Sequence, residues 1–228
     1  MLKKVRKLRL KSPKVGEFNV LGFKLIITKP LPKNINIQNV IKRVKQSVPS
    51  LFYNNLDCIY IGDFSFLKDR DLTAMYKDQV FYVSHKQDNE EDLVDDLIHE
   101  TAHLVEEDYT RLIYEDNKLL SEFLSKREQL YNLLDSDFNF SKEYTLNYSQ
   151  FLNPDYDVSF DNFIYNIIGY EQIVAYTMNI FYSPYALTSL REYFANGFEA
   201  YYYHRDLKKL KNLSPILYNK ISNLEENI

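Results

Sequence analysis

The sequence predicts an α+β fold, with a small mixed β-sheet in its first part and a mostly helical C-terminal half. Up to residue 84, short extended segments alternate with Gly and Pro, whereas after residue 89 apolar residues recur with a helical period. Among 228 residues, 45% are hydrophobic and 26% charged, which is typical of a globular chain. Five glycines and seven prolines exclude fibrous and low-complexity classes.

The segments of the first part can be assigned in order. Residues 18–28 are predicted to be extended and broken by glycine, and residues 36–48 to form a helix with one apolar side. Residues 58–61 are typical of a short buried strand. Residues 72–76 and 80–84 flank a polar tripeptide and are predicted to form a hairpin.

A helix follows this hairpin. Asn89 is a plausible N-cap, and Glu90, Glu91 and Asp92 suit the positive end of the helix dipole. The body of the helix is apolar enough to be buried, through Leu93, Val94, Leu97, Ile98, Ala102, Leu104 and Val105.

The same helix carries the motif HExxH, as His99-Glu100-Thr101-Ala102-His103. Two histidines four residues apart lie on one helix face, where both imidazoles can reach a single zinc ion. Glu100 projects to the side of that face, where its carboxylate can act as a general base toward water. A buried histidine pair with a structural role is the alternative, and it leaves the polar groups without obvious partners.

A later helix offers a third ligand for such an ion. Thr188 or Ser189 can cap it, and Glu192, Asn196 and Glu199 then share one stripe at i, i+4 and i+7. Its opposite, apolar stripe consists of Leu190, Phe194, Phe198 and Tyr201. A glutamate on the polar stripe can complete a His-His-Glu site.

The two motifs together, HETAHLVEEDY and EYFANGF, resemble those of the metallopeptidases related to anthrax lethal factor and the secreted Pro-Pro endopeptidases. The resemblance implies a zincin fold, one Zn²⁺ bound by His99, His103 and Glu192, and Glu100 as general base. It also implies that Tyr185, seven residues before Glu192, stabilises the oxyanion. The expected activity is that of a zinc endopeptidase acting on a protein or peptide.

The chain departs from that family at two places. Asn196 stands where the family usually has a glutamate that supports the ligands, so Glu199 is either a substitute for it or an alternative third ligand. Glu107, one turn after His103, is another expected supporting residue. The separation between His103 and Glu192 is larger than in the family's best-known members. Residues of about 110–182 are therefore expected to be an insertion.

The hairpin strand before the motif helix is the expected substrate contact. In zincins the strand that precedes this helix often lies at the cleft edge, where an extended substrate adds as a further strand. This assigns main-chain substrate contacts to Val80, Phe81, Tyr82 and Val83, with an ordinary edge strand as the alternative. His85 is expected to be a surface histidine in the loop after the strand, with a place lining the cleft as the alternative, and His204 is expected to be structural.

The remaining segments are assigned from periodicity and breakers. Residues 111–135 are predicted to be a long helical stretch, 136–160 a loop or irregular insertion, and 163–181 helical. From residue 207 the chain is predicted to be helical, with a break at Pro215.

The domain prediction is a basic N-terminal arm, residues 1–15, followed by a single catalytic domain, residues 16–228. The arm carries seven Lys or Arg before the first acid, Glu17, and lacks the apolar core of a secretory signal. A cytoplasmic protein without a membrane span is therefore expected, with non-classical release or delivery in a larger particle as alternatives. Two other functions stay open: an inactive zincin in an assembly, and a nucleic-acid-binding module that uses the arm.

Overall fold

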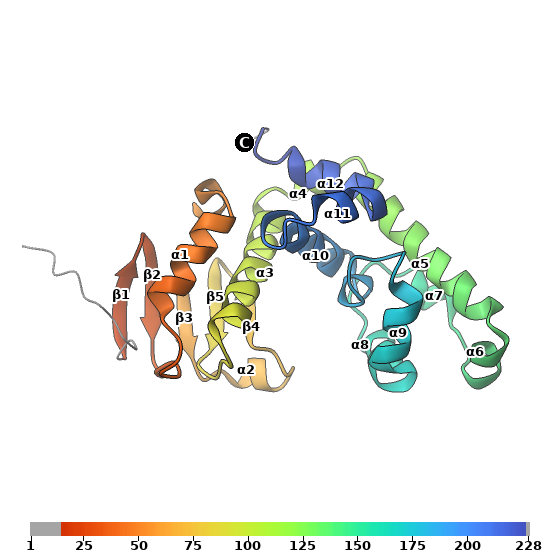
Figure 1. Ribbon diagram of the computed structural model, residues 1–228, viewed down its shortest axis with the longest axis horizontal. Helices are drawn as coiled ribbons and strands as arrows, with labels where there is room; N and C mark the ends of the chain where they lie inside the picture. Colours follow the sequence, from red (N-terminus) through yellow and green to blue (C-terminus); the bar gives the residue numbers. More distant parts are fainter. Residues whose placement is uncertain (1–14, 227–228) are drawn as a thin grey trace, which may run out of the picture. The chain divides into compact units, whose positions relative to one another are not determined.

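The computed structural model describes residues 15–226, which form two compact units (Figure 1). The first unit ends at Leu104 and the second begins at Val105. This boundary falls inside one unbroken helix, α3 (Glu90–Asp108), so the chain passes between the units as regular helix. The predicted basic arm, apart from residue 15, lies outside the described residues.

The first unit contains a five-stranded mixed sheet in the order β1-β2-β3-β5-β4. The pairs β2–β3 and β3–β5 are parallel, and the two outer pairs are antiparallel. The strands are β1 (Gly16–Val20), β2 (Phe23–Ile27), β3 (Cys58–Gly62), β4 (Ala74–Lys77) and β5 (Val80–Ser84). The predicted α+β class and small mixed sheet are confirmed.

Both antiparallel pairs are hairpins closed by two-residue turns with positive φ. Leu21 and Gly22 form the first turn, at φ 52° and 97°, and Asp78 and Gln79 form the second, at φ 50° and 64°. Two successive residues with positive φ match the right-handed twist of the strands they join. The sequence predicted the second hairpin, although β4 begins at Ala74 rather than at residue 72.

One face of the sheet forms the core of the first unit. Leu25, Ile61 and Val83, from three adjacent strands, are fully buried on this face. Helices α1 (Ile37–Ser47) and α3 lie on the same side of the sheet in Figure 1. Two short helical turns, η1 (Ser50–Tyr53) and α2 (Ser65–Lys68), complete the connections. The arrangement fixes α3 against the sheet through its apolar side, as its sequence indicated.

In the described part of the second unit, residues 105–226, the regular structure is helical. After the end of α3, its elements are α4 (Thr110–Tyr114), α5 (Lys118–Ser136), α6 (Phe138–Glu143), α7 (Tyr148–Phe151), α8 (Val158–Asn162), η2 (Phe163–Gly169), α9 (Tyr170–Thr177), η3 (Tyr185–Leu187), α10 (Leu190–Tyr202), α11 (Leu207–Leu213) and α12 (Pro215–Ser222). Pro215 begins α12, where a missing N–H costs nothing, so the predicted break at this residue is confirmed.

One prediction for this unit was wrong. The segment 136–160 is not a loop, because it contains α6, α7 and the start of α8. Asn147 and Asp157 cap α7 and α8 with their side chains, and Phe151 and Phe160 are fully buried. The helical stretch predicted over 111–135 is confirmed, as two helices separated at Asn117, whose φ of 56° interrupts the helical path. Local caps and tertiary burial outweighed the weak periodicity of these residues.

Helix α10 packs closely against α12. A Cβ atom on Gly197 would lie 2.4 Å from a Leu217 methyl carbon, so only glycine permits this approach. The carboxylate of Glu122 on α5 accepts hydrogen bonds from the backbone N–H groups of Ile216 and Leu217, at 2.8 and 3.0 Å. Glu122 therefore caps the N-terminus of α12 from a neighbouring helix.

A membrane span was not expected from the sequence, and residues 15–226 contain no helix that is both long and apolar enough to cross a bilayer.

Candidate metal centre

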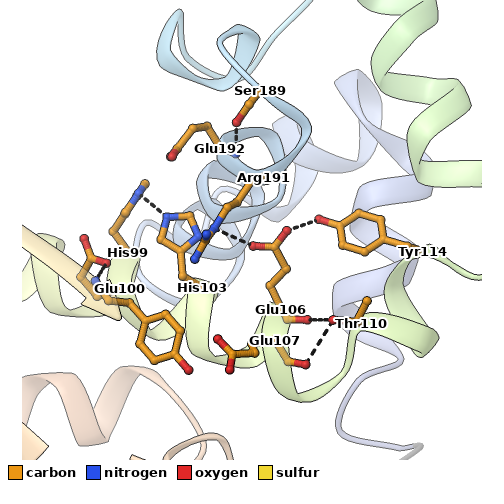
Figure 2. A network of polar contacts seen from close by, with 11 residues as sticks. His99, Glu100, His103, Glu106, Glu107, Thr110, Tyr114, Ser189, Arg191 and Glu192 are labelled. Atoms are coloured by element: carbon orange, nitrogen blue, oxygen red, sulfur yellow. Dashed lines mark hydrogen bonds and ion pairs between the residues drawn. The ribbon is translucent and has the colours of Figure 1, made fainter. Parts of the chain in front are cut away.

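His99 and His103 lie one turn apart on α3 and direct the same ring nitrogen toward each other. Their Nε2 atoms are 3.2 Å apart, and the two rings are nearly perpendicular, at 83° (Figure 2). His103 is buried and His99 half-buried. The HExxH spacing thus gives a converging pair of imidazoles on a helix held against the sheet.

The separation of these nitrogens fits a zinc ion. With Zn–N bonds near 2.05 Å and a tetrahedral angle, two ligand nitrogens would be about 3.3 Å apart. The observed 3.2 Å also permits a hydrogen bond between neutral imidazoles, in which one ring donates and the other accepts. Imidazole nitrogens are ligands that zinc prefers, and the separation of these two fits a zinc ion.

Glu100, the expected general base within the motif, is buried, at 6% exposure. Its Oε2 accepts a hydrogen bond from the backbone N–H of Tyr76 in β4. Within the described sheet β4 is an outer strand that pairs with β5 alone, and this N–H points away from β5. The carboxylate is therefore fixed at the edge of the sheet, one residue along the helix from His99.

The expectation that Val80, Phe81, Tyr82 and Val83 offer main-chain contacts to a substrate was wrong. These residues belong to β5, which pairs with β3 on one side and with β4 on the other. The main-chain N–H and C=O groups on both sides of β5 are therefore hydrogen-bonded to neighbouring strands of the sheet. The sequence predicted the hairpin correctly. It could not show that the second strand of the hairpin, β5, pairs with β3, which leaves the first strand, β4, at the edge of the sheet.

Glu192 lies in the first turn of α10, in the second unit. Ser189, rather than Thr188, caps this helix: its Oγ accepts a hydrogen bond from the backbone N–H of Glu192 at 3.1 Å. The cap fixes the start of α10 and the backbone of the proposed third ligand. Glu192 is half-buried.

One group of potential metal ligands stands out within residues 15–226, and it consists of His99, His103 and Glu192. Glu199 does not belong to this group. Of the two glutamates that the sequence left open as third ligand, Glu192 is thus the candidate.

Asn196, which replaces the acid expected from the resemblance, has a partner of its own. It is 5% exposed, and its Oδ1 accepts a hydrogen bond from the hydroxyl of Ser183. Ser183 lies two residues before Tyr185, so this bond attaches the segment that carries Tyr185 to α10. Tyr185 begins a 3₁₀ turn that Thr188 closes, and 39% of Tyr185 is exposed.

Glu106 is a residue of this region that the sequence did not single out. Its Oε2 is 3.2 Å from Nε of Arg191, and its Oε1 accepts a hydrogen bond of 2.6 Å from the hydroxyl of Tyr114 (Figure 2). Glu107, the expected supporting residue, has an exposed side chain, and its carbonyl accepts a hydrogen bond from Thr110. A spacing of i+7 from His99 could have indicated Glu106, because that spacing returns to the same helix face.

The insertion adds two further groups near Glu192. Burial raises the pKa of Asp161, the hydrogen bond from Tyr156 lowers it, and the nearby charge of Glu192 raises it again. Burial, followed by the charge of Asp161, raises the pKa of Tyr165 well above its ordinary range. Nothing in the local sequence indicated these positions, because they reach Glu192 only through the packing of α8 and η2.

The two remaining histidines, His85 and His204, lie elsewhere. The backbone N–H of His85 donates to the carbonyl of Gly62 at the end of the sheet, at 2.8 Å. The ring of His204 stacks on Tyr182, with 6.3 Å between the ring centroids. Neither belongs to the group of potential ligands among the described residues.

Comparison with protein-family models, with curated proteins and with solved structures gives no match to this chain. Its function is therefore inferred from its own side chains and their chemistry.

Proposed function

We propose that this chain is a zinc-dependent endopeptidase with a zincin fold. His99, His103 and Glu192 would hold one zinc ion, Glu100 would be the general base, and Tyr185 would stabilise the oxyanion. The observation that carries the proposal is the HExxH helix, in which two converging Nε2 atoms lie 3.2 Å apart beside a buried carboxylate.

The side chains around the proposed site suit hydrolysis rather than a purely structural role. When bound, zinc would supply Lewis acidity toward a peptide carbonyl and toward water. Glu100 would accept a proton from the attacking water and then pass it to the leaving amine. The hydroxyl of Tyr185 would donate a hydrogen bond to the carbonyl oxygen as negative charge develops there. A structural zinc site needs neither of these two groups.

The edge of the sheet supports a peptide as substrate. Successive residues of a strand direct their main-chain groups to opposite sides, so Ala74 shares the outward direction of Tyr76 on β4. The Tyr76 N–H on that side already reaches Glu100. An extended peptide that pairs with β4 would therefore run past the general base, with affinity from main-chain hydrogen bonds.

The proposal is tested with the purified full chain and its Glu100→Gln variant. We expect about one zinc per chain in both proteins, and cleavage of a mixed peptide library by the wild type alone. His103→Ala should lose the zinc. Cleavage that persists in Glu100→Gln would contradict the mechanism, and zinc binding without any cleavage would favour an inactive zincin.

A further inference from the structure

We infer that Glu106 and Arg191 are positioning residues that set the first turn of α10, and with it Glu192, relative to the histidine helix. This inference rests on the proposed function, because it assigns to the pair a role in zinc binding. The ion pair connects two helices of the proposed site. Glu106 lies in the last turns of α3, and Arg191 is the residue just before Glu192 in α10.

The position of Glu106 on α3 is the first argument. His99, His103 and Glu106 stand at i, i+4 and i+7, so the carboxylate continues the stripe of the two imidazoles. Helix α3 is unbroken from Glu90 to Asp108, so Glu106 and both histidines belong to one continuous helix. A contact to Glu106 is therefore a contact to the helix that carries the two imidazoles.

The environment of the contact is the second argument. The Glu106 side chain is 14% exposed and that of Arg191 51%, so the carboxylate of this ion pair is largely removed from water. Tyr114 donates to the other oxygen of the same carboxylate. Burial and the neighbouring Glu106 raise the pKa of Tyr114, which keeps its hydroxyl protonated as a donor. Glu106 is thus held on both oxygens and has one orientation.

The start of α10 is the third argument. Ser189 fixes the backbone N–H of Glu192, and Arg191 fixes the same turn from the side chain of the preceding residue. Glu192 follows His103 by 89 residues, and most of the chain between them is the segment of about 110–182, which is expected from the sequence to be an insertion. A ligand supplied from so far along the chain needs a contact that sets its helix, since misplacement of outer partners weakens metal binding by about 10–100-fold.

The test measures zinc affinity by chelator competition, together with the melting temperature, for Glu106→Gln, Arg191→Gln and the double variant of the full chain. We expect each single variant to weaken zinc binding by about tenfold or more, and the double variant to be no weaker than the worse single variant. Arg191→Lys should retain most of the affinity, because a lysine ammonium can still form an ion pair with Glu106.

Asp116→Asn is the matched control. Asp116 pairs with Lys220 at 3.0 Å in the same unit, and its variant should leave zinc affinity unchanged. If Glu106→Gln and Arg191→Gln lower the melting temperature but leave zinc affinity at the wild-type value, the positioning role is wrong and the proposed function still stands. A wild-type chain that binds no zinc would overturn both proposals.

Discussion

The backbone N–H of Tyr76 donates a hydrogen bond to Oε2 of Glu100, and this bond joins the edge of the sheet to the HExxH helix. It gives the carboxylate a structural partner in addition to its proposed role in catalysis. A buried backbone donor that loses its acceptor costs about 1–3 kcal/mol.

The first prediction separates these two roles of Glu100. Glu100→Ala should lower the free energy of unfolding by about 1–3 kcal/mol, because the Tyr76 N–H loses its acceptor. Glu100→Gln should change stability much less, since its amide oxygen can still accept, and should nevertheless abolish peptide cleavage. Urea denaturation of both variants checks the prediction, and equal destabilisation by the two would contradict it.

The second prediction concerns the hydroxyl of Tyr185. Tyr185→Phe should lower kcat by a factor of roughly 10²–10³ and change KM little, if the hydroxyl acts on developing negative charge. Tyr182→Phe removes a hydroxyl from the same segment and is the control, for which wild-type kcat is expected. Steady-state kinetics on a peptide found in the library screen would show the difference, and a Tyr185→Phe enzyme with unchanged kcat would exclude the role.

The third prediction concerns the packing of α10 on α12. Gly197→Ala should destabilise the protein by about 1–3 kcal/mol, because its Cβ would lie 2.4 Å from Leu217. Leu217 is buried, so Leu217→Ala alone should also be destabilising, by about 2–5 kcal/mol. The double variant should be more stable than the sum of the two effects implies, since the clash is gone. Thermal denaturation of the four proteins measures this coupling.

The fourth prediction concerns acid sensitivity. Hydrogen bonds from the Lys118 backbone and the Lys220 ammonium lower the pKa of Asp116 to about 2 in the folded protein. Because this pKa lies below the unfolded value, Asp116 stabilises the fold above pH of about 4, and the contribution is lost as pH falls toward about 2. The stability difference between the wild type and Asp116→Asn should therefore shrink over that interval. A difference that stays constant from pH 5 to pH 2 would contradict the assignment.

The sequence by itself determined the parts of the candidate site that depend on local geometry. His99 and His103 converge because a helix places residues i and i+4 together, and the apolar side of that helix predicted its burial. The cap by Ser189 and the turn at Asp78 and Gln79 are also local, since both follow from contacts or torsions within a few residues.

Only the tertiary structure decided which elements meet. The crossover that puts β4 rather than β5 at the edge depends on strand pairing, which the alternation of apolar residues does not encode. Arg191 pairs with Glu106 rather than with the neighbouring Glu107. This choice depends on which face of α3 the first turn of α10 contacts. Such contacts join residues far apart in the chain, and their energies arise from burial and charge that exist only once the helices have packed.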